Sequence, residues 1–163
     1  MEERNFICCF TGHRHLPPES ADQMLFQLNR TLDILIRSGV SVFRAGGALG
    51  FDTVAALAVL DKKAQSPHIQ LEMYIPCRTQ PSKWSSEERE VYEYVLSRAD
   101  KVTVLHEQYT PNCMHERNRF MVDGSNFCVA FLTSDTGGTA YTVNYAKKKG
   151  VKVINLADIL DVN

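Results

Sequence analysis

The sequence predicts a three-layer α/β domain, in which a doubly wound, mainly parallel sheet of about six strands carries helices on both faces. Two observations predict this class. Short apolar segments alternate with helical patterns along the chain, and most of these segments are apolar on both faces. Such strands are typical of a parallel sheet buried between helix layers. We therefore expect a Rossmann-like architecture in a single domain, residues 1–163, because this length suffices for one core.

The expected strands are short apolar runs bounded by turn residues or helix ends. They cover residues 6–10, 40–44, 69–75, 101–106, 126–132 and 151–156. Cys8, Cys9 and Cys128 fall inside these runs, where a free thiol packs as a small apolar side chain. The chain has five cysteines without a repeated spacing, which indicates a reduced, cytoplasmic protein rather than a disulfide framework.

Five helices are expected between the strands, and capping signals bound several of them. Ser20 with Gln23 and Ser85 with Glu88 have the spacing of capping boxes. Gly39 follows the first helix as an end cap. The helical segments cover about residues 20–38, 52–64, 85–98, 112–125 and 137–150.

The composition favours a globular protein over one that coats nucleic acid. The formal net charge is −1, so the chain has no excess of Lys and Arg to neutralise a phosphate backbone. We therefore expect nucleic acid not to be a partner, although a local basic pocket remains compatible with this balance. No apolar run reaches the length of a membrane span, and the opening residues MEERN lack the charge pattern of a signal peptide. We expect no membrane partner.

Glycine, hydroxyl and arginine side chains follow the expected strands. In an open parallel sheet, ligands bind outside the carboxyl ends of the strands, near the point where strand order reverses. Glycine-rich helix starts and Arg side chains bind phosphate oxygens there. We expect a nucleotide or nucleotide-derived ligand, with no other cofactor and no metal. The candidate ligand-binding residues are Thr11, Gly12, His13, Arg14, Arg44, Gly46, Gly47, Gly50, Asp52, Trp84, Arg117, Asn118, Thr136, Gly137, Gly138 and Thr139.

The two glycine turns have structural as well as functional explanations. GGALGFD, residues 46–52, is not a Walker loop, because no Lys-Ser/Thr follows, and Ala45 stands where G-x-G-x-x-G needs its first glycine. A tight turn with close helix–strand packing explains it equally well. Asp52 either complements the helix dipole or accepts hydrogen bonds from ribose hydroxyls. In DTGGT, residues 135–139, Thr139 as the N-cap of a plain turn is the alternative to phosphate binding.

The histidines and carboxylates lack the spacing of a metal site. HERNR, residues 115–119, is not H-E-x-x-H, and Cys113 with His115 gives too few ligands. Glu116 and Arg119 are spaced as a surface pair on a helix. If the protein is an enzyme, Asp52, Glu116 and Arg117 are the candidate catalytic residues.

The order and spacing of the motifs resemble the YpsA-like family, a bacterial branch of the SLOG superfamily. The segments that carry the resemblance are FTGHR, GGALGFD, the proline and tryptophan of the third loop, RNRFMVDGS and GGT, between Phe6 and about Leu156. The resemblance implies a Rossmann-like domain with a nucleotide pocket, as in the related DNA-processing protein DprA and the plant LOG enzymes. It also implies a homo-oligomer that pairs through helices flanking the pocket. Residues 91–99 are a candidate surface for this pairing, although a face packed on the core is the commoner meaning of such a stripe.

A comparison with LOG phosphoribohydrolases bears on catalysis. Those enzymes carry M-H-x-R-K ahead of P-G-G-x-G-T-x-x-E, whereas here Asn118 replaces the Lys and Thr142 stands in place of the Glu. A hydroxyl cannot supply the negative charge that an oxocarbenium-like transition state demands. We therefore expect a cytoplasmic sensor or regulatory protein. The alternatives are a nucleotide-processing hydrolase and DprA-like binding of single-stranded DNA, with Trp84 and Tyr109 as stacking residues.

Overall fold

The α/β class is confirmed by a computed structural model, which describes residues 5–160. The beginning of the MEERN segment therefore lies outside the described residues. Within them, one parallel sheet has the strand order β4-β3-β2-β1-β5-β6. Its strands are β1 Phe6–Gly12, β2 Val40–Ala45, β3 Gln70–Cys77, β4 Lys101–His106, β5 Phe127–Phe131 and β6 Lys152–Asn155.

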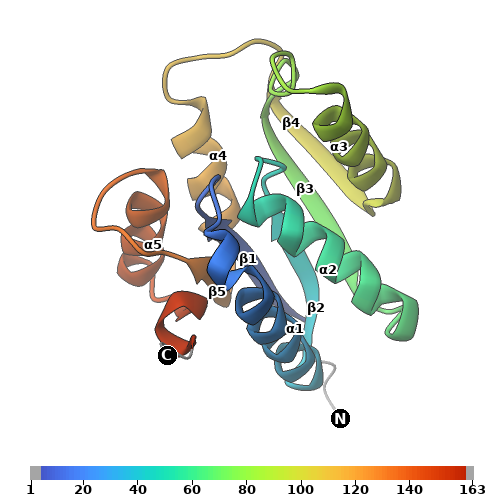
Figure 1. Ribbon diagram of the computed structural model, residues 1–163, viewed down its shortest axis with the longest axis vertical. Coiled ribbons are helices and arrows are strands. Elements are labelled where there is room, and N and C mark those ends of the chain that lie inside the picture. The colour runs from blue at the N-terminus through green and yellow to red at the C-terminus, as the bar shows by residue number, and fades with distance from the viewer. Residues whose placement is uncertain (1–4, 161–163) are drawn as a thin grey trace.

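The helices cover the sheet on both sides, as expected. In Figure 1, α1, α2 and α3 lie over one side of the sheet, and α4 and α5 lie apart from them. Two short 3₁₀ helices, which the sequence patterns did not indicate, precede α1 and follow β6. The bounds are η1 Pro18–Ser20, α1 Ala21–Arg37, α2 Phe51–Gln65, α3 Ser86–Arg98, α4 Cys113–Val122, α5 Gly138–Lys148 and η2 Leu156–Ile159. No helix within this part of the chain is both long enough and apolar enough to cross a bilayer.

The strand order reverses between β1 and β5. From β1 the chain adds β2, β3 and β4 outward on one side, and α4 then returns it to place β5 on the other side of β1. Cys9 pairs with Cys128, and Gly12 pairs with Phe131, in parallel register. The carboxyl ends of β1 and β5 therefore meet at the point where ligands bind in doubly wound sheets.

Both faces of β1, β3 and β5 are mostly buried, as expected for strands that are apolar on both sides, whereas the edge strands β4 and β6 contain no buried residue. Phe10 and Phe43 pack on one face, in a core that α1, α2 and α3 complete. Cys9 and Cys128 belong to a smaller cluster with side chains of α4 and α5 on the other face. All five cysteines are buried and free.

One of the two predicted capping boxes is correct and the other is wrong. The Ser85 hydroxyl accepts the N–H of Glu88 at 3.1 Å, and the Glu88 carboxylate accepts the N–H of Ser85 at 2.9 Å. Ser20 precedes α1 but makes no capping hydrogen bond, and its hydroxyl instead donates to the Pro17 carbonyl. Gly39 ends the first helix with a φ of 108°, as its position predicted.

Candidate functional site

A pocket of about 380 Å³ lies at the carboxyl edge of the sheet, beside the point where strand order reverses. This volume is within the range of small-molecule sites. A larger hollow of about 580 Å³, lined by Gly39 and His68 among others, has no Arg or Lys in its lining. The first pocket is lined by Thr11, Gly12, His13, Arg14, Ala48, Asp52, Gln80, Trp84, Met114, Arg117, Asn118, Gly138 and Thr139.

Arg117 extends from α4 into the wall of this pocket, and its side chain is almost fully buried. Its Nε donates to Asn118 Oδ1 at 2.7 Å, and its Nη1 donates to the Gly46 and Tyr74 carbonyls. These acceptors are neutral, and within residues 5–160 no ion pair includes Arg117. Burial lowers the pKa of Arg117, although nearby Asp52 opposes that effect. The guanidinium therefore has Asp52 as its nearby opposite charge and only neutral hydrogen-bond acceptors.

Asp52 lines the pocket from the first turn of α2, and it is 6% exposed. Its Oδ2 accepts the N–H of Ala48 at 3.3 Å, and the structure shows no other hydrogen bond to this carboxyl within the described chain. Burial raises the pKa of Asp52 to about 6, although the charge of Arg117 and the Ala48 N–H act in the opposite direction. The side chain can therefore exchange a proton near neutral pH.

The N-terminus of α5 is open toward the pocket. Gly137 is the N-cap, with a φ of 98°, and no side chain caps the helix. The prediction of Thr139 as N-cap is therefore wrong, because Thr139 lies within the first turn and lines the pocket. A Cβ added at Gly137 or Gly138 would meet no atom within 4 Å. The first turn also lacks an acidic residue, so its backbone N–H groups are free to attract an anion.

The glycines of the GGALG turn serve close packing rather than an open cradle. A Cβ at Gly46 would lie 2.6 Å from Arg117 Nη1, and one at Gly50 would lie 2.1 Å from the Arg14 carbonyl oxygen. Gly47 has a φ of 73°, and its added Cβ would lie 2.8 Å from Ile75 Cδ1. None of these three glycines lines the pocket, so the structure favours the tight-turn explanation for them.

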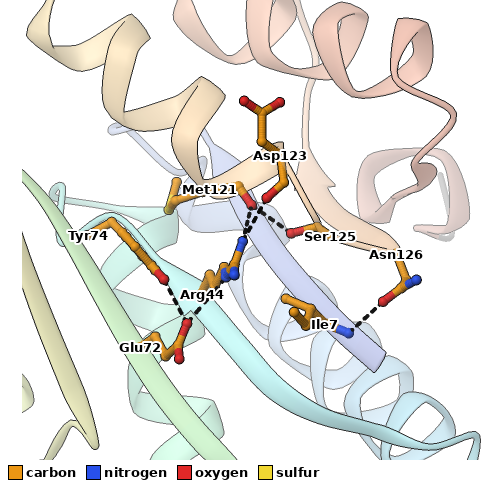
Figure 2. Close-up of polar contacts among 8 residues, drawn as sticks. All are labelled: Ile7, Arg44, Glu72, Tyr74, Met121, Asp123, Ser125 and Asn126. Carbon is orange, nitrogen blue, oxygen red and sulfur yellow. Dashed lines mark hydrogen bonds and ion pairs between the residues drawn. The ribbon is translucent and has the colours of Figure 1, made fainter. Parts of the chain in front are cut away.

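Arg44, another candidate, lies away from the pocket. Figure 2 shows its side chain between β2, β3 and the end of α4. Its Nε donates to Glu72 Oε1 at 3.3 Å, and its Nη1 donates to the carbonyls of Met121 and Asp123. These contacts make Arg44 a link between the sheet and the C-terminus of α4. Thr136 and Gly137 also lie outside the lining of the pocket.

Glu116, a candidate catalytic residue, does not line the pocket either. Its carboxylate pairs with His106 Nε2 at 2.8 Å. The predicted surface pair between Glu116 and Arg119 is absent from the ion pairs of the described residues, and Arg119 donates to the Tyr141 hydroxyl at 2.8 Å. Of the three candidate catalytic residues, the structure brings together Asp52 and Arg117.

His13 and Trp84 line the pocket and also have structural partners. His13 Nε2 accepts the N–H of Thr133 at 2.9 Å, which ties the loop after β1 to the end of β5. The Trp84 ring meets Tyr92 edge to face, with ring centres 5.3 Å apart.

Three lining residues, Ala48, Gln80 and Met114, were not among the candidates. Met114 belongs to the segment MHERN, whose resemblance to the LOG motif M-H-x-R-K could have indicated it as a site residue. Gln80 lies in a loop without a recognisable pattern. Asn118 and Thr142, the two departures from the LOG motif, contact each other. Asn118 Nδ2 donates to Thr142 Oγ1 at 2.9 Å, and that hydroxyl donates to the Gly138 carbonyl at 2.9 Å. A neutral chain of hydrogen bonds thus joins Arg117 to the start of α5.

The fold is that of a Rossmann-like domain, and a pocket with a buried guanidinium lies at its switch point. The chain belongs to the YspA SLOG family (YpsA), whose model matches residues 19–161. It is 32% identical to the uncharacterised SPbeta prophage-derived protein YoqJ of Bacillus subtilis, over 65% of this chain and 69% of that protein. It is 30% identical to a UPF0398 protein of Bacillus cereus, over 76% of this chain and 68% of that protein.

Solved structures share the fold at low sequence identity. DNA processing protein A (DprA) from Helicobacter pylori, whose description names a single-stranded DNA binding mode, has a TM-score of 0.66 at 18% identity, over 92% of this chain. The Moco carrier protein of Chlamydomonas reinhardtii has a TM-score of 0.52 at 21% identity, over 94% of this chain and 77% of its own. This chain spans 64% of the Helicobacter protein. The comparisons give no support to the expectation that nucleic acid is not a partner.

Proposed function

We propose that the protein binds a nucleotide or nucleotide-derived ligand in the pocket at the switch point, as a cytoplasmic sensor or regulatory protein. The observation that carries this proposal is that Arg117, which is buried and donates hydrogen bonds only to neutral acceptors, lines the same pocket as the uncapped start of α5. A cation and a helix N-terminus both attract negative charge, and their convergence favours a phosphate group.

The remaining lining residues suit the other parts of a nucleotide. Arg14 is exposed at the mouth and adds a second cation, while the Trp84 ring offers an aromatic surface for a base. Asp52 offers a carboxylate oxygen to ribose hydroxyls. These roles are proposals for this chain.

The experiment that tests the proposal places a negative charge at the start of α5. Wild type and the Gly138→Asp variant are titrated calorimetrically with ribonucleoside mono-, di- and triphosphates. We expect at least one nucleotide to bind the wild type, and the affinity of Gly138→Asp for it to fall at least about 10-fold. The unliganded variant keeps its melting temperature, since an acidic residue in the first turn complements the helix dipole.

Gly138→Asn is the matched control, because it adds a side chain of the same size without the charge. The proposal fails if no nucleotide binds the wild type, or if the Asp and Asn variants bind equally well.

A nucleotide-processing hydrolase is the second candidate, and the raised pKa of Asp52 favours it. A carboxyl with a pKa of about 6 can donate or accept a proton near neutral pH. Incubation with the same nucleotides, followed by detection of free base and phosphate, tests this candidate. Turnover that Asp52→Asn abolishes would support it, and equal product with both proteins would remove it.

The structural likeness to DprA makes single-stranded DNA a third occupant to test. Binding of a fluorescent oligonucleotide should then weaken steeply with salt.

We also propose a homo-oligomer, supported by the exposed Val91 and Tyr94 on α3. Light scattering at several protein concentrations tests that state.

A further inference from the structure

Gln80 has an unusual position in the lining of the pocket. Its side-chain oxygen, Oε1, is buried and accepts no hydrogen bond from any residue between 5 and 160. Its Nε2 donates to the Gly47 carbonyl at 3.5 Å, and the Gln80 side chain lies beside the Tyr92 hydroxyl. The reversed amide would set two acceptor oxygens against each other at Gly47, which favours this orientation.

A buried acceptor without a donor calls for an explanation. Nearly all buried polar atoms in proteins are paired, and an unpaired one points to a strained or catalytic group or to a partner that the chain itself does not supply. Gln80 lines a pocket that already attracts an anion through Arg117 and α5. The open acceptor therefore indicates a ligand that also carries a hydrogen-bond donor.

The loop that carries Gln80 also supplies an aromatic surface. Successive turns run from Cys77 to Trp84, with backbone bonds from Gln80 N to Cys77 O and from Trp84 N to Pro81 O, both 3.1 Å. The Trp84 ring is held by its edge-to-face contact with Tyr92. This one loop thus contributes an unpaired acceptor and an aromatic ring to the residues that line the pocket. That combination suits a nucleobase.

The two ends of the pocket are far enough apart for different parts of one ligand. Gln80 and Trp84 follow β3, whereas Gly138 opens the helix after β5, and β2 and β1 lie between those two strands. Three steps between neighbouring strands span roughly 14 Å. A phosphate at α5 can therefore be joined through a sugar to a base near Trp84.

We propose that Gln80 is a specificity-determining residue, whose side-chain oxygen accepts a hydrogen bond from an N–H group of a base lying against Trp84. The inference rests on the proposed function and adds the class of ligand, a nucleotide recognised through its base as well as its phosphate. A sugar phosphate lacks a base to lie against Trp84, and a small inorganic anion offers Gln80 Oε1 no N–H donor.

The test compares ligands with and without a base on variants of Gln80. Wild type, Gln80→Met and Gln80→Glu are titrated calorimetrically with AMP, GMP, CMP, UMP and ribose 5-phosphate. Met matches the length of Gln without an acceptor, and Glu keeps an acceptor oxygen. We expect the wild type to bind at least one of the nucleotides about 10-fold more tightly than ribose 5-phosphate.

Gln80→Met should lose that preference and still bind ribose 5-phosphate like the wild type, which also shows that the variant is folded. Gln80→Glu, in which a carboxylate oxygen would face the Gly47 carbonyl in place of Nε2, should recover only part of the preference. The inference is overturned if Gln80→Met retains the preference, or if the wild type binds ribose 5-phosphate as tightly as every nucleotide; in the latter case anion binding at α5 still stands. A wild type that binds none of the five compounds overturns this inference, and the proposed function fails with it when the di- and triphosphates do not bind either.

Discussion

At the scale of single residues, the pocket depends on the space beside Gly46 in which the buried Arg117 side chain lies. Gly46 has no Cβ, and the space that a Cβ would take is occupied by Arg117 Nη1 and Asp52 Oδ2. The sequence indicated these residues as candidates, because glycine, Arg and Asp after strands suit an anion site. It could not indicate that Gly46 contacts the protein's own Arg117, since that contact joins residues 71 positions apart.

The pKa of Asp52 predicts a dependence of stability on pH. Burial raises this pKa from 3.8 to about 6, so the folded protein binds a proton that the unfolded chain releases between those values. The stabilisation that this proton provides is complete below pH 3.8 and is lost as the pH rises through 6. The loss amounts to about 3 kcal/mol. Asp52→Asn removes this group. Between pH 4 and pH 7.5, the free energy of unfolding of the wild type should therefore fall by that amount relative to that of Asp52→Asn.

Urea unfolding at several pH values measures this difference. Asp135→Asn, which changes an exposed carboxylate in the loop before α5, is the control and should follow the wild-type curve. Parallel curves for Asp52→Asn and wild type would contradict the raised pKa.

At the scale of elements, two cap signals of the same spacing had different outcomes for a local reason. Ser85 has the extended backbone of an N-cap, with a φ of −63° and a ψ of 162°. Ser20 follows Pro17 and Pro18, which begin a 3₁₀ turn, and its φ of −112° and ψ of 4° keep its hydroxyl away from the N–H groups of α1. Sequence spacing alone carries no information on these backbone angles.

The two serines give a matched pair of substitutions. Ser85→Ala should lower the free energy of unfolding by about 1 kcal/mol, because the N–H of Glu88 loses its acceptor. Ser20→Ala should change it by less than about 0.5 kcal/mol, since only a long bond to the Pro17 carbonyl is lost. Denaturant titrations of both variants measure the difference, and equal losses would contradict the capping assignment.

At the scale of the whole molecule, alternation of strands and helices predicted the layers but not how the layers meet. The strand at residues 101–106 was predicted with its observed bounds, because an apolar run between polar turns is a local signal. The order of the strands and the placement of α4 depend on packing between distant segments. Arg44 illustrates the consequence. Its position near the end of a strand suggested the ligand edge, but its side chain extends toward α4.

Arg44 predicts how the sheet and α4 depend on each other. It joins β2 to Glu72 on β3 and to two carbonyls at the end of α4 (Figure 2), and the Arg44 and Glu72 side chains are 16% and 15% exposed. Arg44→Met replaces the guanidinium by an unbranched apolar side chain and leaves Glu72 without its cation. We therefore expect a loss of about 3 kcal/mol in the free energy of unfolding. Replacing both Arg44 and Glu72 by Met should cost less than Arg44→Met alone, because no charge is then left unpaired.

Urea titrations of the two variants, with Arg119→Met as a control on α4, separate this link from a general effect of losing a cation. Arg119 donates to the Tyr141 hydroxyl at the surface, so its loss should change the free energy of unfolding much less than Arg44→Met does. Because Arg117 lies on the helix that Arg44 anchors, nucleotide affinity should fall in Arg44→Met and not in Arg119→Met. A stable Arg44→Met protein with unchanged affinity would show that α4 keeps its position without this link.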